Sequence, residues 1–164
     1  MSQLAGPRSD LESARRCLRE RFGFDSFRAG QEAIVGCILG GKNIVGVMPT
    51  GSGKSLCYQL PALLMDGITL VVSPLIALMA DQVNGLRARG LPVTFINSSL
   101  DLDEQDARIG DTVEGKYKIV FIAPERFRST RFTSALKRVK VSLFAVDEAH
   151  CRSEERRVGK ECRL

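Results

Sequence analysis

Residues 48–55 read Met-Pro-Thr-Gly-Ser-Gly-Lys-Ser. The apolar run 43–47 before this stretch is expected to be a strand, and the apolar residues from Leu56 onward are expected to begin a helix. A glycine-rich turn between a strand and a helix is the context of a phosphate-binding loop. Gly51 and Gly53 allow backbone N–H groups to converge on a phosphate, and the positive end of the helix adds to the attraction.

The two residues that end the loop have side chains suited to phosphate chemistry. Lys54 supplies a mobile positive charge for the β- and γ-phosphates of a nucleotide, and the Ser55 hydroxyl can ligate Mg²⁺. Met48 stands where the common pattern has glycine, but the later glycines remain. The alternative interpretation is an ordinary strand–turn–helix corner that happens to contain glycine and lysine.

Composition indicates one globular domain. The chain has 164 residues, 44% of them hydrophobic and 26% charged, which is ordinary for a soluble protein. A net charge of +5 permits contact with a polyanion without requiring it. The five cysteines form no C-x-x-C pair and there is one histidine, so neither a zinc or redox motif nor a His-rich metal site is indicated. No run approaches the ~18 apolar residues of a membrane span, and no secretory signal is evident, so we expect an intracellular soluble protein.

Apolar runs and helical spacing alternate along the chain. Helices are expected at 9–22, where Ser9 and Glu12 fit a capping box, and at 30–39, 75–88, 101–113 and 132–139. Strands are expected at 43–47, 68–72, 93–96, 118–122 and 141–146. This alternation predicts an α/β fold with a mostly parallel sheet covered by helices on both faces. Functional residues should then gather at the carboxyl ends of the strands.

A polar cluster, Asp147-Glu148-Ala149-His150, directly follows the last expected strand. Asp147 is suited to hold Mg²⁺, and Glu148 to orient and deprotonate an attacking water. The alternative is a surface turn, where acidic residues are common. The presence of both this cluster and the phosphate loop favours nucleotide hydrolysis.

Five motifs in order resemble the first motor lobe of the RecQ family of ATP-dependent DNA helicases, in superfamily 2, over about residues 18–151. They are residues 24–31, with Phe24, Arg28 and Gln31; 48–60, MPTGSGKSLCYQL; 73–82, SPLIALMADQ; 123–126, APER; and 147–151, DEAHC. The resemblance implies a RecA-like P-loop NTPase lobe, incomplete at its C-terminus, that uses ATP and Mg²⁺. It also implies translocation on single-stranded DNA and unwinding of duplex DNA, with 3′ to 5′ polarity, in recombination and repair.

The resemblance also implies a role for individual residues. The nucleotide would be bound by Phe24, Arg28, Gln31, Thr50, Gly51, Ser52, Gly53, Lys54 and Ser55. Gln31 would engage adenine, because a glutamine amide can pair with N6 and N7 of that base. Catalysis would use Lys54, Asp147 and Glu148, with Ser55 and Asp147 as Mg²⁺ ligands. Single-stranded DNA would be contacted by Pro74, Leu75, Gln82, Pro124, Glu125 and Arg126, and His150 would couple hydrolysis to the bound strand.

The expected organisation has three parts: a leader and helix at 1–23, a partial ATP-binding lobe at 24–151, and a segment at 152–164 that departs from the family. Residues 152–162 match the translation of a common sequencing-adapter string, so we expect read-through rather than native sequence; a solvated charged tail is the alternative. Without residues 152–164 the net charge falls from +5 to +3, because five basic and three acidic residues are removed. We also expect that the second motor lobe required for turnover is missing.

Two other functions remain open at this point. One is a DEAH-type motor that acts on RNA, and the other is a non-catalytic module that binds a nucleotide or nucleic acid. No membrane partner is expected, and the compartment would be the cytoplasm or nucleoid in a bacterium and the nucleus in a eukaryote.

Overall fold

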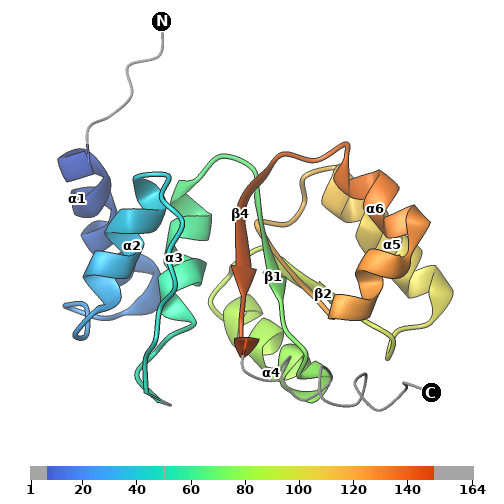
Figure 1. Cartoon of the computed structure of the whole chain (residues 1–164), viewed down its shortest axis with the longest axis horizontal. Helices are drawn as coiled ribbons and strands as arrows, with labels where there is room; N and C mark the ends of the chain where they lie inside the picture. The colour runs from blue at the N-terminus through green and yellow to red at the C-terminus, as the bar shows by residue number, and fades with distance from the viewer. Residues whose placement is uncertain (1–6, 50, 150–164) are drawn as a thin grey trace, which may run out of the picture. The chain divides into compact units, whose positions relative to one another are not determined.

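The computed structural model describes residues 7–49 and 51–149, with side chains from residue 10 onward. The chain divides into two compact units, Met1–Gly67 and Ile68–Leu164 (Figure 1). In the described part of the chain, no helix is long and apolar enough to cross a membrane.

The first unit is built from helices. These are α1 (Pro7–Cys17), which continues into a short π-helix, η1 (Leu18–Phe22), then α2 (Gln31–Leu39) and α3 (Leu56–Leu64). Gly23 ends η1 in the left-handed conformation that glycine adopts without strain. The core of the unit consists of apolar side chains from all three α-helices and η1: Ala14, Leu18, Phe22, Val35, Ile38 and Leu60. The unit is thus held together by helix-on-helix packing.

The prediction that Ser9 caps the first helix is wrong, because α1 begins earlier, at Pro7. Proline suits the first turn of a helix, where its missing N–H would have no partner in any case. The last predicted helix is also shifted: α6 spans Thr130–Leu136 instead of 132–139. Ser129 explains the earlier start, because its Oγ accepts a hydrogen bond from the N–H of Phe132 at 3.3 Å.

The predicted strand at 43–47 is also wrong. These residues pair with no strand in the described part of the chain, and Val45 and Val47 are 90% and 93% exposed. A strand is defined by hydrogen bonds to a neighbour, so an apolar sequence alone cannot form one.

The second unit contains the parallel sheet that the sequence predicts. Its strands are β1 (Ile68–Val72), β2 (Val93–Ile96), β3 (Ile119–Ile122) and β4 (Val141–Val146). They form one four-stranded sheet in the order β2-β3-β1-β4, and every pairing is parallel. The connections carry α4 (Ile76–Arg87), α5 (Leu102–Val113), a 3₁₀ helix, η2 (Pro124–Arg128), and α6. The α/β class with a parallel sheet is therefore confirmed.

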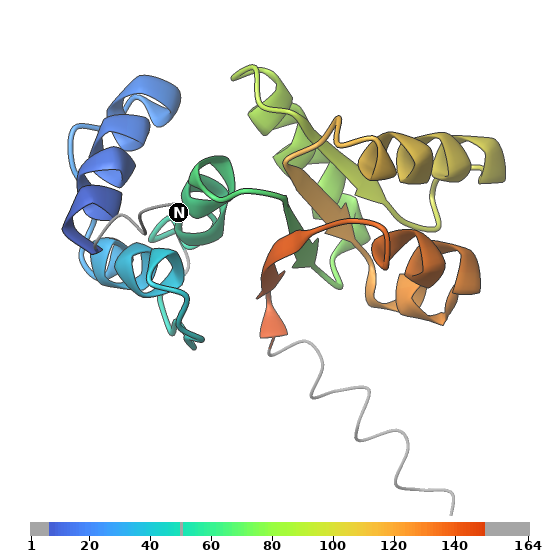
Figure 2. The ribbon, with the colours of Figure 1, turned by 90° about the horizontal axis from the view of Figure 1, so that it is seen from above.

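Helices cover both faces of this sheet, as Figure 2 shows, with α4 on one face and α5 and α6 on the other. On the α5 and α6 face, Phe132 packs against alternating residues of the strands: Ile68, Leu70, Val72, Ile96, Val120 and Ile122. Alternate residues of a strand point to opposite faces, which explains why nearly every residue of β1 and β3 is buried.

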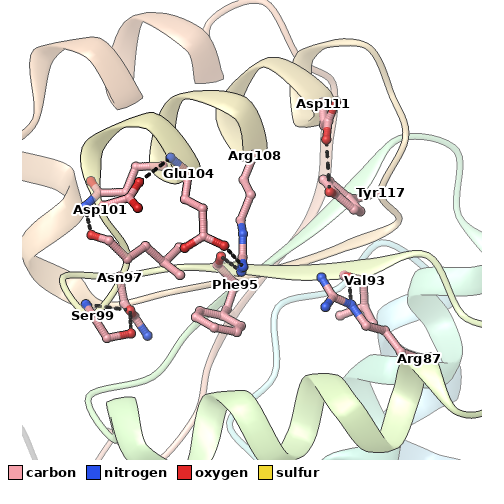
Figure 3. Close-up of polar contacts among 12 residues, drawn as sticks. Arg87, Val93, Phe95, Asn97, Ser99, Asp101, Glu104, Arg108, Asp111 and Tyr117 are labelled. Atoms are coloured by element: carbon pink, nitrogen blue, oxygen red, sulfur yellow. Dashed lines mark hydrogen bonds and ion pairs between the residues drawn. The ribbon is translucent and has the colours of Figure 1, made fainter.

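The two outer strands of the sheet differ in their surroundings. Along β2, Arg87 Nε donates to the carbonyl of Val93 at 3.1 Å, and Arg108 Nη1 donates to the carbonyl of Phe95 at 3.0 Å (Figure 3). The Arg108 guanidinium also lies 4.5 Å from the centre of the Phe95 ring. Outer strand β4, in contrast, leaves Val141, Phe144 and Val146 between 39% and 53% exposed. Arginines from the flanking helices thus occupy two edge carbonyls of β2.

Candidate nucleotide and nucleic-acid sites

The phosphate loop has the backbone that its glycines predict. Gly51 and Gly53 have φ values of 79° and 82°, in the left-handed region. The N–H of Ser52 donates to the carbonyl of Pro49 at 3.2 Å, which closes a tight turn. Within the described residues, the N–H groups of Gly53 and Ser55 are bonded to no carbonyl. Free N–H groups in such a concave turn are suited to an anion.

Helix α3 starts immediately after the loop. The N–H groups of Leu56 and Cys57 donate to the carbonyls of Gly53 and Lys54 at 3.1 and 3.0 Å, so the last loop residues already form the first turn. Ser55 precedes the helix without a capping bond from its side chain, which leaves the hydroxyl for a metal ion. The helix end therefore adds its positive potential next to Lys54 and Ser55.

Met48, the departure from the common loop pattern, has a local packing role. Its sulfur lies 3.9 Å from the Sγ of Cys57 in the first turn of α3. Burial raises the pKa of the Cys57 thiol, which keeps it protonated at neutral pH. The methionine thus connects the start of the loop to the helix that follows it.

Arg28, just before α2, and Gln31, the first residue of α2, hold the carbonyl side of the loop. Gln31, only 2% exposed, donates from Nε2 to the carbonyls of Ser52 and Gly53 at 3.2 and 3.1 Å. Arg28 Nη1 donates to the carbonyl of Gly51 at 2.9 Å. Because these bonds engage the loop carbonyls, they fix the orientation of the peptide groups whose N–H groups would bind phosphate.

The same bonds use most of the hydrogen-bonding capacity of Gln31. Its amide has two hydrogens, one for each loop carbonyl, and its Oε1 accepts from the N–H of Arg28 at 2.9 Å. Pairing with N7 of adenine needs an amide hydrogen, so it would require breaking a bond to the loop. Phe24, in contrast, is 42% exposed. The adenine contacts of Phe24, Arg28 and Gln31 stay predictions.

The carboxylates lie at the carboxyl end of β4, as predicted for a parallel sheet. The N–H of Asp147 donates to the carbonyl of Val72 at 2.9 Å, so pairing with β1 fixes its backbone. Asp147 Oδ1 accepts from the N–H of Glu148 at 2.9 Å, and Glu148 has a φ of 50°. A non-glycine residue in the left-handed region is strained, a feature that often marks functional sites. Lys54 and Ser55 belong to the other unit, so joint binding of phosphate and Mg²⁺ stays a prediction.

The residues assigned to nucleic acid follow β1 and β3, at the same end of the sheet. Pro74, Leu75 and Gln82 come after β1, and Pro124, Glu125 and Arg126 after β3. Three of their buried polar atoms have no hydrogen-bond partner among the described residues: Gln82 Oε1, Glu125 Oε1 and Arg126 Nε. Buried polar atoms usually have partners, so these are candidates for contact with a ligand or water. Thr50 and His150 lie outside the described residues.

Sequence reasoning missed one contact at this end of the sheet. Gln105, in the first turn of α5, accepts a hydrogen bond from Arg126 Nη1 at 2.5 Å. The two residues are 21 positions apart, and a glutamine in a polar helix gives no local signal of such a role.

A phosphate-type loop before a helix in one unit, and carboxylates after a parallel strand in the other, are both features typical of P-loop nucleotide-binding proteins of the α/β class. The DEAD/DEAH box helicase family matches residues 28–163, so the chain belongs to this family. The fold is similar to a crystal structure of a hypothetical ATP-dependent RNA helicase from Sulfolobus tokodaii, with a TM-score of 0.69 and 25% identity, over 90% of this chain and 44% of that one. The RecA-like fold of a helicase lobe is thus confirmed.

Several curated relatives are RecQ-type helicases. The ATP-dependent DNA helicase RecQ of Haemophilus influenzae is 45% identical over 137 residues, covering 84% of this chain and 22% of the relative. RecQ of Bacillus subtilis is 43% identical over 145 residues, covering 88% and 24%. ATP-dependent DNA helicase Q5 of Rattus norvegicus is 45% identical over 148 residues, covering 85% and 15%. The resemblance to the RecQ family is confirmed, and the chain spans 15% to 24% of the length of these relatives.

Proposed function

We propose that this chain is the nucleotide-binding part of an ATP-dependent DNA helicase of the RecQ type. The observation that carries the proposal is the phosphate loop: Arg28 and Gln31 hold its carbonyls, while among the described residues the N–H groups of Gly53 and Ser55 are bonded to no carbonyl. The names of the relatives support ATP as the nucleotide and DNA as the substrate.

The roles of individual residues follow from their chemistry. Lys54 neutralises the β- and γ-phosphates, and the loop N–H groups of Gly53 and Ser55, which bond to no carbonyl among the described residues, bind them. Ser55 and Asp147 would supply hard oxygen ligands of the kind that Mg²⁺ prefers. Mg²⁺ supplies charge neutralisation of the phosphates when bound. Glu148 holds the attacking water and accepts its proton.

Nucleic acid binds at the carboxyl ends of β1 and β3. Support comes from the buried polar atoms of Gln82, Glu125 and Arg126 that have no partner among the described residues. Glu125 and Arg126 also directly follow β3, at the sheet end where ligands of α/β proteins bind. Contacts to phosphates make such binding independent of base sequence and sensitive to salt. His150 couples the bound strand to hydrolysis.

In the complete protein, a second motor lobe supplies an arginine for the transition state, and the two lobes translocate 3′ to 5′ and unwind duplex DNA in recombination and repair. The protein works inside the cell, in the cytoplasm and nucleoid or in the nucleus. A non-catalytic binding module is excluded if the complete protein turns over ATP.

The name of the Sulfolobus tokodaii neighbour favours one alternative, a motor that acts on RNA. ATP hydrolysis by the complete protein should therefore be compared with oligothymidylate and with oligouridylate of equal length. We expect strong stimulation by the DNA and little by the RNA. Stimulation by the RNA alone would contradict the DNA helicase and support a motor that acts on RNA.

We also infer that residues 152–164 are adapter read-through, although the family match extends to residue 163. The support is the agreement of residues 152–162 with a translated adapter string. A long sequencing read across the codon of Cys151 should continue into further helicase sequence. A genomic read that encodes Arg152 to Leu164 would contradict the inference.

A further inference from the structure

Arg126 is held on one side of its guanidinium. It lies in η2, which directly follows β3, and its Nη1 donates to Gln105 Oε1 at 2.5 Å. Its Nε is buried and has no partner among the described residues. The guanidinium is a rigid, planar group of five N–H donors, so a bond to Nη1 also sets the direction of the donors on Nη2.

Gln105 is itself held at both ends of its amide. While Oε1 accepts from Arg126, Nε2 donates to the carbonyl of Leu100 at 2.8 Å. The backbone N–H of Gln105 donates to the carbonyl of Asp101 at 3.0 Å, in the first turn of α5. A side chain with both amide groups bonded has a single orientation, so the position of Arg126 depends on the segment that contains Leu100.

That segment, residues 97–101, is well bonded. Asn97 is 1% exposed, and its Oδ1 accepts from the N–H and the Oγ of Ser99 at 3.0 and 2.6 Å (Figure 3). Asp101 Oδ1 accepts from the N–H of Glu104 at 2.7 Å and caps α5. Strands β2 and β3 are paired, with Ile96 opposite Ile122, so the segments that follow them are neighbours. Gln105 thus connects two adjacent strand ends.

We propose that Gln105 is a positioning residue for nucleic-acid binding: it orients Arg126 so that the Nη2 donors face a phosphate of the bound strand. The inference rests on the proposed function, and it extends that function to a residue outside all five sequence motifs. An arginine that is already oriented loses less side-chain entropy when it binds, and therefore binds more tightly.

The test is a double-mutant cycle on the affinity of the complete protein for fluorescein-labelled oligothymidylate, measured by anisotropy. Arg126→Ala should weaken binding and reduce the salt slope by about one. Gln105→Leu should weaken binding by about two- to twelvefold, the effect of freeing one side chain. In the Arg126→Ala background, Gln105→Leu should have no further effect.

Two further variants separate positioning from folding. Gln105→Glu keeps an acceptor for Arg126 Nη1 but loses the donor to Leu100 and adds a negative charge. At a salt concentration that screens this charge, its affinity should lie closer to wild type than that of Gln105→Leu. Glu104→Gln, a change in the same turn that affects only the contact with Arg108, should not weaken binding. Circular dichroism and the melting temperature establish that each variant is folded.

Failure of the Gln105 proposal and failure of the proposed DNA contact would give different results. If Gln105→Leu weakens binding equally with and without Arg126, the positioning role is overturned while the Arg126 contact stands. If Arg126→Ala leaves both the affinity and the salt slope unchanged, the proposed contact of this segment with DNA is overturned, and the role of Gln105 with it.

Discussion

Gly53 combines a backbone requirement with a steric one. Its φ is +82°, and a Cβ at this position would lie 2.7 Å from Gln31 Nε2. Gly51 has a similar φ of +79°, but a Cβ there would meet no atom within 4 Å. Alanine at either position would strain the backbone, but only alanine at position 53 would also contact Gln31. Comparing the two variants therefore separates the effect of backbone strain from the effect of the Gln31 contact.

We predict that Gly53→Ala weakens ATP binding more than the matched variant Gly51→Ala. Both variants carry the left-handed strain of an L-residue, about 1–2 kcal/mol. Only Gly53→Ala also displaces the Gln31 amide, which costs roughly a further 1 kcal/mol, or about fivefold in affinity. Titration of the complete protein with a fluorescent ATP analogue measures the difference. Equal losses in the two variants would show that the Gln31 contact contributes nothing.

Gln31 has two candidate roles, the observed contact with the loop and the predicted contact with adenine, and a substitution can distinguish them. We predict that Gln31→Leu weakens the binding of ATP and of inorganic triphosphate by the same factor, about tenfold, because two hydrogen bonds to the loop are lost. Glu32→Gln, at the next residue of α2, is the control: its exposed ion pair with Arg15 does not touch the loop, so the change should have little effect. Loss of ATP affinity with unchanged triphosphate affinity would assign Gln31 to adenine instead.

The residues of the loop could be predicted from sequence because glycine, lysine and serine at fixed spacing describe a local backbone. The contacts of Gln31 with Gly53 and of Arg126 with Gln105 could not, because each joins residues more than 20 positions apart. Such pairs are set by how the elements pack, and no periodicity in one element encodes them.

Among the elements, outer strand β2 has an edge that side chains protect from pairing with another chain. Arg108 donates to the carbonyl of Phe95 and lies over its ring, while its side chain is only 16% exposed. An open strand edge is a template for pairing with another chain, and charged side chains that occupy it prevent that.

We predict that Arg108→Ala destabilises β2 locally by about 1–2 kcal/mol, through loss of the edge hydrogen bond and of the contact with the Phe95 ring. Hydrogen–deuterium exchange of peptides from β2 in the complete protein should accelerate about tenfold. Arg131→Ala is the matched control: its ion pair with Asp106 is exposed, so it should contribute at most about 0.5 kcal/mol. Unchanged exchange in Arg108→Ala would show that the arginine does not stabilise the edge.

Elements with continuous apolar runs could be predicted with nearly the observed bounds, as for 68–72 and 93–96. The strand predicted at 43–47 shows the limit of this approach. An apolar run indicates that a segment must be buried, but whether it becomes a strand depends on a neighbour to which its backbone is bonded.

At the scale of the whole molecule, the described residues leave apolar surface uncovered. Phe144 is 53% exposed on outer strand β4, and Val45 and Val47 are almost fully exposed. We predict that the isolated chain of 164 residues self-associates, binds ATP weakly and does not unwind DNA. The transition-state arginine that we propose for a second lobe of the complete protein would account for a hydrolysis rate about 10³–10⁵ lower in the isolated chain. Size-exclusion chromatography with light scattering tests the association, and a stable monomer would contradict it.

The most direct test of the account is the rate of ATP hydrolysis by the complete protein with and without single-stranded DNA, for the wild type and for Glu148→Gln. The account predicts strong stimulation of the wild type by DNA, and a variant that still binds ATP but hydrolyses it at least a hundredfold more slowly, in the range expected for loss of a general base (about 10²–10⁴). Undiminished hydrolysis in Glu148→Gln, or a wild type that DNA does not stimulate, would contradict the account.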